Sequence, residues 1–206
     1  MHLTQLLANY QLSQEAQEQI DLYSNCSFSE CVDDSRKLGA GDLFLAFPGA
    51  SSDGRDYFAE AIAAKVAAII YQAPTQSELV SKQDYFTDSA KQCAGLGIAF
   101  IALDDLAAEA GAIAARFYDN PGSKLTVIGI TGTNGKTSVA TWVAESLSAL
   151  GKRCAIMGTL GVGFPGDIAT TGLTTTGAVA TQKHLFDLYF SRFLDLSIVV
   201  LFTMKK

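Results

Sequence analysis

Residues 129–138 read Gly-Ile-Thr-Gly-Thr-Asn-Gly-Lys-Thr-Ser, and this stretch decides how the rest of the chain is interpreted. It follows an apolar run rich in β-branched residues, Leu125 to Ile130, and precedes a helix-like segment from Thr137 to Leu150. A glycine-rich turn between a strand and a helix presents backbone amides to an anion, and the positive end of the helix dipole points to the same place. The stretch therefore predicts a phosphate-binding loop.

Each residue type in this loop has a physical purpose. Glycine permits the positive φ angles that turn amides toward a phosphate, lysine reaches the β- and γ-phosphates of ATP, and a threonine hydroxyl at the helix start binds Mg²⁺. Lys136 is therefore the predicted catalytic residue and Thr137 the predicted metal ligand. The strict pattern is not met, because Ile130 stands where a first glycine is expected. The predicted ATP-binding residues are Gly132, Thr133, Asn134, Gly135, Lys136, Thr137 and Ser138.

Upstream of the loop, apolar strand-like runs alternate with helix-like segments, which is typical of an α/β domain with a parallel sheet. Asn120-Pro121-Gly122-Ser123 breaks this pattern, so residues 1–120 form one expected domain and residues 121–206 a second. The expected elements are a helical lead-in at 3–20, strands at 43–47, 66–71 and 98–103, helices at 54–65 and about 104–118, and a polar irregular stretch at 72–96.

Composition excludes several classes of protein. The 206 residues are 49% hydrophobic and 17% charged, so the chain has ample material for buried cores and is not disordered. The net charge of −6 disfavours nucleic acid as a partner, because binding to phosphates needs a basic surface. No signal peptide and no membrane-spanning run is recognisable, so we expect a cytoplasmic monomer. The spacing of the four cysteines does not fit a zinc site.

Three separate regions resemble known proteins. Residues 131–137 resemble the ATP loop of the Mur ligases and the folylpolyglutamate synthases. Asp34-Ser35-Arg36, residues 41–46 and Asp53-Gly54-Arg55 resemble the UDP-substrate-binding first domain of the MurE and MurF ligases, which folylpolyglutamate synthases lack. Residues 157–159 and 173–175 resemble the MurE type. The resemblance covers residues 25–189 and is to the Mur ligase family.

This resemblance implies a fold and an activity. The fold would be a small N-terminal α/β domain for the UDP substrate, followed by an incomplete P-loop central domain with a parallel sheet. The activity would be ATP- and Mg²⁺-dependent addition of a third amino acid, expected to be meso-diaminopimelate, to UDP-MurNAc-L-Ala-D-Glu through an acyl phosphate. The residues implied to contact this substrate are Asp33, Ser35, Ala50, Ser51, Ser52, Thr174 and Thr175.

The chain also departs from the family pattern. The family's next block, a strand ending in Glu-Val-Ser-Ser-His, does not occur, and the residues after Tyr189 match nothing expected. We therefore expect the 206 residues to be inactive on their own, and the apolar run 196–202 to be an unpaired strand prone to aggregation. Asp119-Asn120-Pro121-Gly122 is similar to a signature for selecting the amino acid, but its position indicates a turn.

Alternatives to the MurE-type ligase remain open. One is a catalytically inactive fragment that binds nucleotides or UDP-sugars, and another is a MurF-type ligase. A third is a small P-loop kinase or ATPase, for which Asp195 is the nearby candidate for a second metal contact. The sequence does not decide between meso-diaminopimelate and lysine as the third amino acid.

Overall fold

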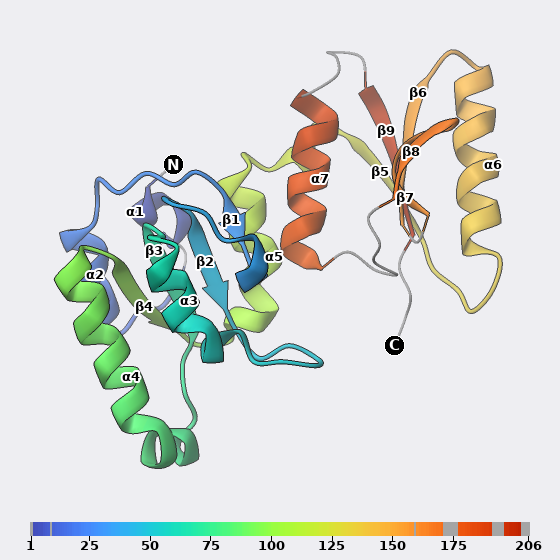
Figure 1. The fold of residues 1–206 in the computed structure, drawn as a ribbon. Coiled ribbons are helices and arrows are strands. Elements are labelled where there is room, and N and C mark those ends of the chain that lie inside the picture. The colour runs from blue at the N-terminus through green and yellow to red at the C-terminus, as the bar shows by residue number, and fades with distance from the viewer. Residues whose placement is uncertain (1, 9, 159, 171–176, 191–195, 203–206) are drawn as a thin grey trace. The chain divides into compact units, whose positions relative to one another are not determined.

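The computed structural model of the chain describes residues 2–8, 10–158, 160–170, 177–190 and 196–202. The chain divides into two compact units, Met1–Ile113 and Ala114–Lys206. Each unit contains its own β-sheet with helices packed against it (Figure 1). The α/β class expected from the alternating pattern is confirmed. Within the described ranges, no helix has the length and apolarity that crossing a bilayer requires.

The first unit is built on a four-stranded sheet with the order β1-β2-β3-β4, in which all neighbours are parallel. Its strands are β1 (Cys31–Val32), β2 (Leu43–Ala46), β3 (Ala68–Gln72) and β4 (Ala99–Leu103). Its helices are α1 (Leu3–Leu6), α2 (Gln14–Leu22), α3 (Phe58–Ala63), α4 (Gln76–Leu96) and α5 (Leu106–Phe117), with 3₁₀ turns η1 (Ser35–Lys37) and η2 (Gly54–Tyr57). α5 continues past the division between the units.

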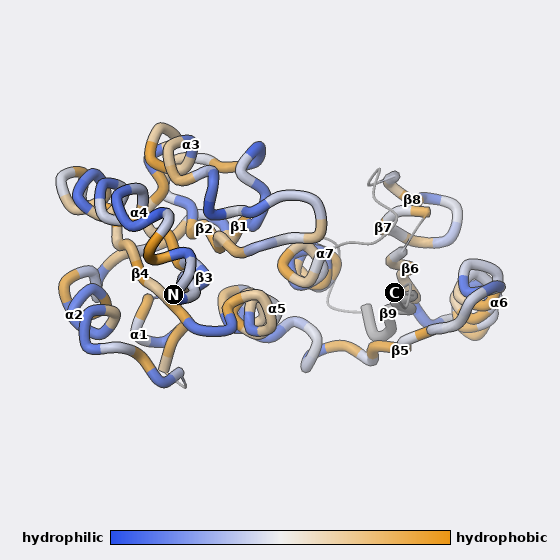
Figure 2. The backbone as a smooth tube through the Cα atoms, turned by 90° about the horizontal axis from the view of Figure 1, so that it is seen from below, coloured by the Kyte–Doolittle hydropathy of each residue, from blue (hydrophilic) through white to orange (hydrophobic). Residues whose placement is uncertain are grey.

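Helices cover both faces of this sheet. Phe44, Ile69 and Phe100 belong to one buried cluster together with Phe58 of α3 and Phe86 of α4. Residues one position further along each strand point to the opposite face and are also fully buried. Figure 2 shows α3 and α4 on one side of the strands and α1, α2 and α5 on the other. Burial on both faces explains why the strands are continuous apolar runs instead of alternating ones.

One helix of the first unit was wrongly expected to be irregular. Residues 76–96 form α4, whose N-terminus is capped by Thr75 in a reciprocal capping box with Glu78 and whose C-terminus ends at Gly97 with φ 73°. Most of its side chains face solvent, and only Phe86, Ser89 and Cys93 are buried. Its low apolar content therefore hid the helical period, although the capping residues were visible in the sequence.

The N-terminal lead-in also differs in detail from the prediction. It consists of two helices, α1 and α2, and Ser13 caps the second by accepting a hydrogen bond from the Ala16 amide at 3.2 Å. Similarly, the helix expected over residues 54–65 begins as the 3₁₀ turn η2 before α3. Serine at such a position accepts bonds from the first helical turn and so starts a new helix.

The second unit contains a five-stranded mixed sheet with the order β5-β9-β6-β7-β8. β5, β9 and β6 are parallel, whereas β7 and β8 add an antiparallel hairpin that the sequence did not predict. The elements are η3 (Pro121–Lys124), β5 (Thr126–Ile130), α6 (Lys136–Ala149), β6 (Arg153–Gly158), β7 (Gly161–Phe164), β8 (Asp167–Ala169), α7 (Ala178–Phe190) and β9 (Leu196–Phe202).

Alternate residues of β6 pack against the two helices of this unit. Cys154 and Ile156 cluster with Ala140 and Ala144 of α6. The residues between and after them, Ala155 and Met157, cluster instead with Leu185 and Leu188 of α7. Figure 1 accordingly shows the sheet between α7 on one side and α6 on the other. The period of two along β6 thus places a helix on each face.

The expectation of an unpaired strand at residues 196–202 is wrong. β9 lies inside the sheet and pairs in parallel with β5 on one side and with β6 on the other. Ile198 is opposite Thr126 of β5 and Cys154 of β6. A strand paired on both sides presents no open row of amides and carbonyls, so the aggregation hazard inferred for an edge does not apply to it.

Candidate functional site

The predicted phosphate loop joins β5 to the N-terminus of α6. Gly135 is the N-cap of α6 with φ 76°, a left-handed conformation that favours glycine, and Gly132 has φ 154°. Residues 131–135 are exposed. The first amides of a helix have no acceptor within the helix, so this turn presents N–H groups and a positive dipole to solvent. The loop geometry suits an anion.

Lys136 lies against this loop. Its ammonium Nζ donates to the Gly132 carbonyl at 2.6 Å and to the Thr133 carbonyl at 3.2 Å. An ammonium has three donors, so these two bonds do not exhaust it. The charge is thereby held beside the loop amides, where a phosphate bound by those amides would also lie.

A second candidate site is a cavity of about 390 Å³ in the first unit, formed where the chain leaves β1 and β2. It brings together four of the residues implied to contact a UDP substrate, Asp33, Ser35, Ser51 and Ser52. Ala50, a fifth, is exposed in the same loop but does not line the cavity. The full lining is Asp33, Asp34, Ser35, Arg36, Phe47, Gly49, Ser51, Ser52, Gly54 and Tyr57.

Residues 48–53, which we call the pocket loop, form one wall of this cavity. Figure 1 shows this connection extending away from the sheet after β2 before the chain returns at η2. Pro48 and Asp53 form an isolated antiparallel bridge, and the Gly49 amide donates to the Ser52 carbonyl at 2.8 Å. At the loop's end a Cβ on Gly54 would lie 3.0 Å from both the N and O of Phe47. Glycine at this position therefore lets the two ends of the loop approach.

Six of the ten lining residues were not among the predicted contacts, and three of these six offer ring or guanidinium groups to a ligand. Phe47 and Tyr57 contribute aromatic rings, on which a base can stack. Arg36 contributes a guanidinium whose Nε donates to the Asp34 carboxylate at 2.8 Å, with the arginine side chain 84% exposed. An ion pair this exposed is weak, so Arg36 remains available to a phosphate. Phe47 could have been found from the sequence, because it directly follows a buried strand, and ligands of α/β sheets bind at the carboxyl ends of the strands.

Two carboxylates that line the cavity have pKa values shifted in opposite directions. Burial raises the pKa of Asp33 above its ordinary value. The side-chain hydrogen bond from Arg36 lowers the pKa of the neighbouring Asp34. Asp33 thus offers a partly desolvated carboxyl whose hydrogen bonds with a ligand would be strong.

Arg55 is buried next to this cavity, with a side chain only 6% exposed. Its Nη2 donates to Asp53 at 2.7 Å and to Glu78 at 2.5 Å. Glu78 also accepts from the amide of Thr75 at 2.7 Å and from its hydroxyl at 2.9 Å. The Tyr85 hydroxyl donates to the Arg55 carbonyl at 2.8 Å. The Asp-Gly-Arg segment noted in the sequence is therefore the centre of an ion-pair network around a buried guanidinium, with both carboxylates partly exposed.

This network predicts a loss of stability in acid. Hydrogen bonds from Arg55 and then Thr75 lower the pKa of Glu78 to about 2, below the ordinary value of about 4.3 for an unfolded chain. A lowered pKa in the folded state stabilises the protein above the unfolded value, and this contribution is lost as the pH falls toward 2. The free energy of unfolding of the original chain, measured with urea, should therefore fall more between about pH 4.5 and pH 2 than that of Glu78→Gln. Equal pH dependence of the two proteins would contradict this.

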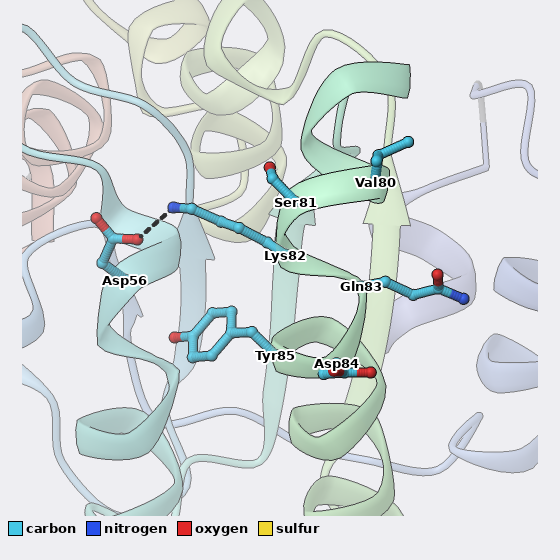
Figure 3. Close-up of a pocket in the computed structure, with 7 residues that line it drawn as sticks. All are labelled: Asp56, Val80, Ser81, Lys82, Gln83, Asp84 and Tyr85. Carbon is cyan, nitrogen blue, oxygen red and sulfur yellow. Dashed lines mark hydrogen bonds and ion pairs between the residues drawn. The ribbon is translucent and has the colours of Figure 1, made fainter.

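Another cavity, of about 430 Å³, lies beside α4 where Lys82 departs from helical geometry with φ −124°. In Figure 3, Lys82 reaches across to Asp56, to which its Nζ donates at 3.0 Å, while Val80 and Gln83 point away from that pair. None of the residues predicted from the sequence lines this cavity. Its one ion pair is largely exposed, with side-chain exposures of 43% and 54%.

The remaining predicted residues have different outcomes. Thr174 and Thr175 lie outside the described residues, as does Asp195. Asp119 and Asn120 have φ values of 58° and 49° and lead into η3, so the interpretation of this segment as a turn is confirmed. Thr137 is half-buried in the first turn of α6, and its role as a metal ligand stays a prediction. Within the described part of the chain, no three His, Cys, Asp or Glu side chains are grouped as a metal site.

Comparison with known proteins shows the family to which the chain belongs. The family profile described as "Mur ligase family, catalytic domain" matches residues 31–118, and that described as "Mur ligase middle domain" matches residues 130–191. The chain belongs to the Mur ligase family. The first match contains the cavity residues at 33–57, and the second contains the phosphate loop and α6.

Named relatives of this Mur ligase chain are UDP-N-acetylmuramoyl-L-alanyl-D-glutamate–2,6-diaminopimelate ligases. The protein from Coxiella burnetii is 41% identical over 150 residues, which are 73% of this chain and 28% of the relative. The protein from Pseudomonas putida is 43% identical over 155 residues, which are 75% of this chain and 28% of the relative. The chain thus spans less than a third of the length of these relatives.

Solved Mur ligase structures share the fold. A 2,6-diaminopimelate ligase of the same name superposes with a TM-score of 0.70 at 23% identity, covering 98% of this chain and 36% of that one. A MurF ligase from Thermotoga maritima, solved in complex with ADP, gives a TM-score of 0.50 at 20% identity and covers 85% of this chain and 32% of that one. At these identities the similarity concerns the fold alone.

Proposed function

We propose that this chain provides the nucleotide-sugar site and the ATP-phosphate site of a ligase that adds diaminopimelate to UDP-MurNAc-L-Ala-D-Glu. The observation that carries this proposal is the cavity of about 390 Å³, which gathers Asp33, Ser35, Ser51 and Ser52 in the unit that precedes the phosphate loop. The diaminopimelate ligases named above, at 41% and 43% identity, support this substrate over that of a MurF-type ligase.

In this proposal, residues 1–120 hold the UDP substrate and residues 121–206 hold ATP. Phe47 and Tyr57 flank the uracil base, whereas Arg36 and the amides of Ser51 and Ser52 bind the diphosphate. These groups suit a nucleoside diphosphate because aromatic rings stack on bases and guanidinium and amide donors match phosphate oxygens. Thr174 and Thr175 are proposed to contact the muramoyl portion.

The amides of residues 132–138 and Lys136 hold the triphosphate at the start of α6, and the Thr137 hydroxyl holds Mg²⁺. When bound, ATP supplies the phosphoryl group that activates the substrate carboxylate for attack by an amine. Such a transfer depends on positioning and on neutralising charge. Lys136 contributes a fixed positive charge there, held by the carbonyls of Gly132 and Thr133.

The second candidate function is binding without turnover. It is favoured by one observation, the absence of a Glu-Val-Ser-Ser-His block from the 206 residues. Under this reading the chain, tested on its own, binds UDP and Mg·ATP but forms no amide bond.

These readings are separated by two measurements on the 206-residue chain. Titration with UDP is expected to shift the amide signals of Ser35, Ser51 and Ser52, while equal concentrations of GDP shift them less. Phosphate release with ATP, UDP-MurNAc-L-Ala-D-Glu and meso-diaminopimelate is expected to equal that of Lys136→Ala. Release clearly above this variant would refute binding without turnover, and unmoved signals with UDP would refute the nucleotide-sugar site.

A further inference from the structure

Arg55 does not line the nucleotide-sugar cavity, yet it holds one wall of it. Its guanidinium lies between Asp53, the last residue of the pocket loop, and Glu78 in the first turn of α4. Nη1 also reaches the Gln72 carbonyl at the end of β3, at 3.5 Å. One side chain therefore connects the pocket loop to both the sheet and α4.

The bonds to Asp53 fix the end of the loop. The Asp53 carboxylate accepts from the Arg55 amide at 2.9 Å and from Nε at 3.0 Å, in addition to Nη2 at 2.7 Å. Asp53 also forms the bridge to Pro48 that closes the loop. Because the same residue accepts these bonds and closes the loop, the orientation of Arg55 sets the position of the turn that carries Ser51 and Ser52.

The bonds to Glu78 hold Arg55 in turn. The Glu78 carboxylate is fixed by the two bonds from Thr75 in the capping box of α4. Tyr85, further along α4, donates its hydroxyl hydrogen bond to the Arg55 backbone carbonyl. The buried guanidinium uses both carboxylates as acceptors, so removal of one would leave some of its N–H donors unsatisfied away from water.

The backbone of the pocket loop also closes the loop. Residues 48–52 are exposed, and two backbone hydrogen bonds, Gly49 N–H to Ser52 and Gly54 N–H to Phe47 at 3.0 Å, close it. Ordering a free loop when a ligand binds costs conformational entropy, and a loop ordered in advance avoids that cost.

We propose that Arg55 is a positioning residue for the nucleotide-sugar pocket. By binding Asp53 and Glu78 at once, it keeps the pocket loop folded before a ligand arrives, so that Ser51 and Ser52 already face a nucleoside diphosphate. This role rests on the function proposed above for the cavity, but the preformed loop is a property of the unliganded chain and is measurable without a ligand.

Two variants test the role. Glu78→Gln retains the capping box, since glutamine serves in it, but removes one charge that holds Arg55. Arg55→Lys retains the positive charge but loses the planar fork that binds two carboxylates. The matched control is Asp56→Asn, which removes the exposed pair with Lys82 between the same two elements, η2 and α4 (Figure 3).

The readout is amide hydrogen exchange at Gly49 and Gly54, with Ile70 in β3 as the reference for unfolding of the whole unit. Both variants are expected to speed exchange at the two glycines by roughly tenfold or more beyond the change at Ile70, as expected for lost hydrogen bonds to a charged group, because Ile70 reports only the loss of stability of the whole unit. UDP affinity should fall by about tenfold in parallel. Asp56→Asn should change none of these values.

Unchanged exchange at Gly49 and Gly54 in both variants would overturn the positioning role. Equal acceleration at Ile70 would also overturn it, because Arg55 would then only stabilise the unit as a whole. The proposed function can fail separately. If UDP moves no amide signal of the pocket residues in the original chain, the nucleotide-sugar assignment is refuted. The exchange rates would still decide whether Arg55 positions the loop.

Discussion

Replacing Lys136 by alanine is expected to weaken binding of Mg·ATP to the chain by roughly 10- to 100-fold. The ammonium lies 2.6 Å from the Gly132 carbonyl, at the edge of the loop that is expected to bind the phosphates. Its loss removes a charge-assisted bond to the triphosphate and leaves the loop amides as the remaining donors. Isothermal titration calorimetry with Mg·ATP measures the change in affinity directly.

Lys152 provides a matched control for this variant. It is an exposed lysine at the opposite end of α6, just after Gly151, so Lys152→Ala removes the same charge far from the loop. It should leave the affinity for Mg·ATP within about twofold of the original, because exposed charges beyond about 10 Å are screened at ordinary ionic strength. If both variants weaken binding equally, general electrostatic attraction, and not the loop, holds the nucleotide.

Replacing Phe58 by alanine is expected to destabilise the first unit by about 3–5 kcal/mol. Phe58 is fully buried, and its ring centroid lies 5.0 Å from that of Phe100, 5.5 Å from Tyr71, 5.6 Å from Tyr85 and 6.0 Å from Phe86. Truncation leaves a cavity among four rings, and the surrounding structure relaxes only partly to fill such a cavity. Since a domain's total stability is about 5–15 kcal/mol, the loss is large.

Urea unfolding followed by circular dichroism measures this loss. Val80→Ala is the control, because Val80 is on α4 of the same unit but 81% exposed, and its free energy of unfolding should change by less than about 0.5 kcal/mol. A loss below about 1 kcal/mol for Phe58→Ala would mean that the rings do not form a tightly packed core.

Much of the fold was predictable because burial on both faces leaves a strong signal. β2, β3 and β4 are continuous apolar runs, and each was predicted within two residues of its observed bounds. α4 was missed because only three of its 21 residues are buried, so polarity masked its period. The pairing of β9 was missed because strand order depends on contacts between distant segments, and no local pattern places residues 196–202 between β5 and β6.

The sites were predictable to different degrees. The phosphate loop is a local motif whose strand, turn and helix are contiguous, so the sequence contained all of it. The cavity depends on two loops that follow β1 and β2. The resemblance suggested Asp33, Ser51 and Ser52, and the two serines also follow a strand end, where α/β sheets bind ligands. Tyr57 and the buried role of Arg55 were not foreseen, because both follow from the way η2 folds back against Phe47 and α4.

Titration of the isotope-labelled 206-residue chain with Mg·ATP tests the central claim most directly. The account predicts saturable shifts of the amide signals of residues 132–137 at the mouth of α6, with much smaller shifts for Mg·AMP, which lacks the β- and γ-phosphates. If those signals stay in place in a folded sample while Mg·ATP reaches millimolar concentration, the loop is not a triphosphate site and the account is contradicted.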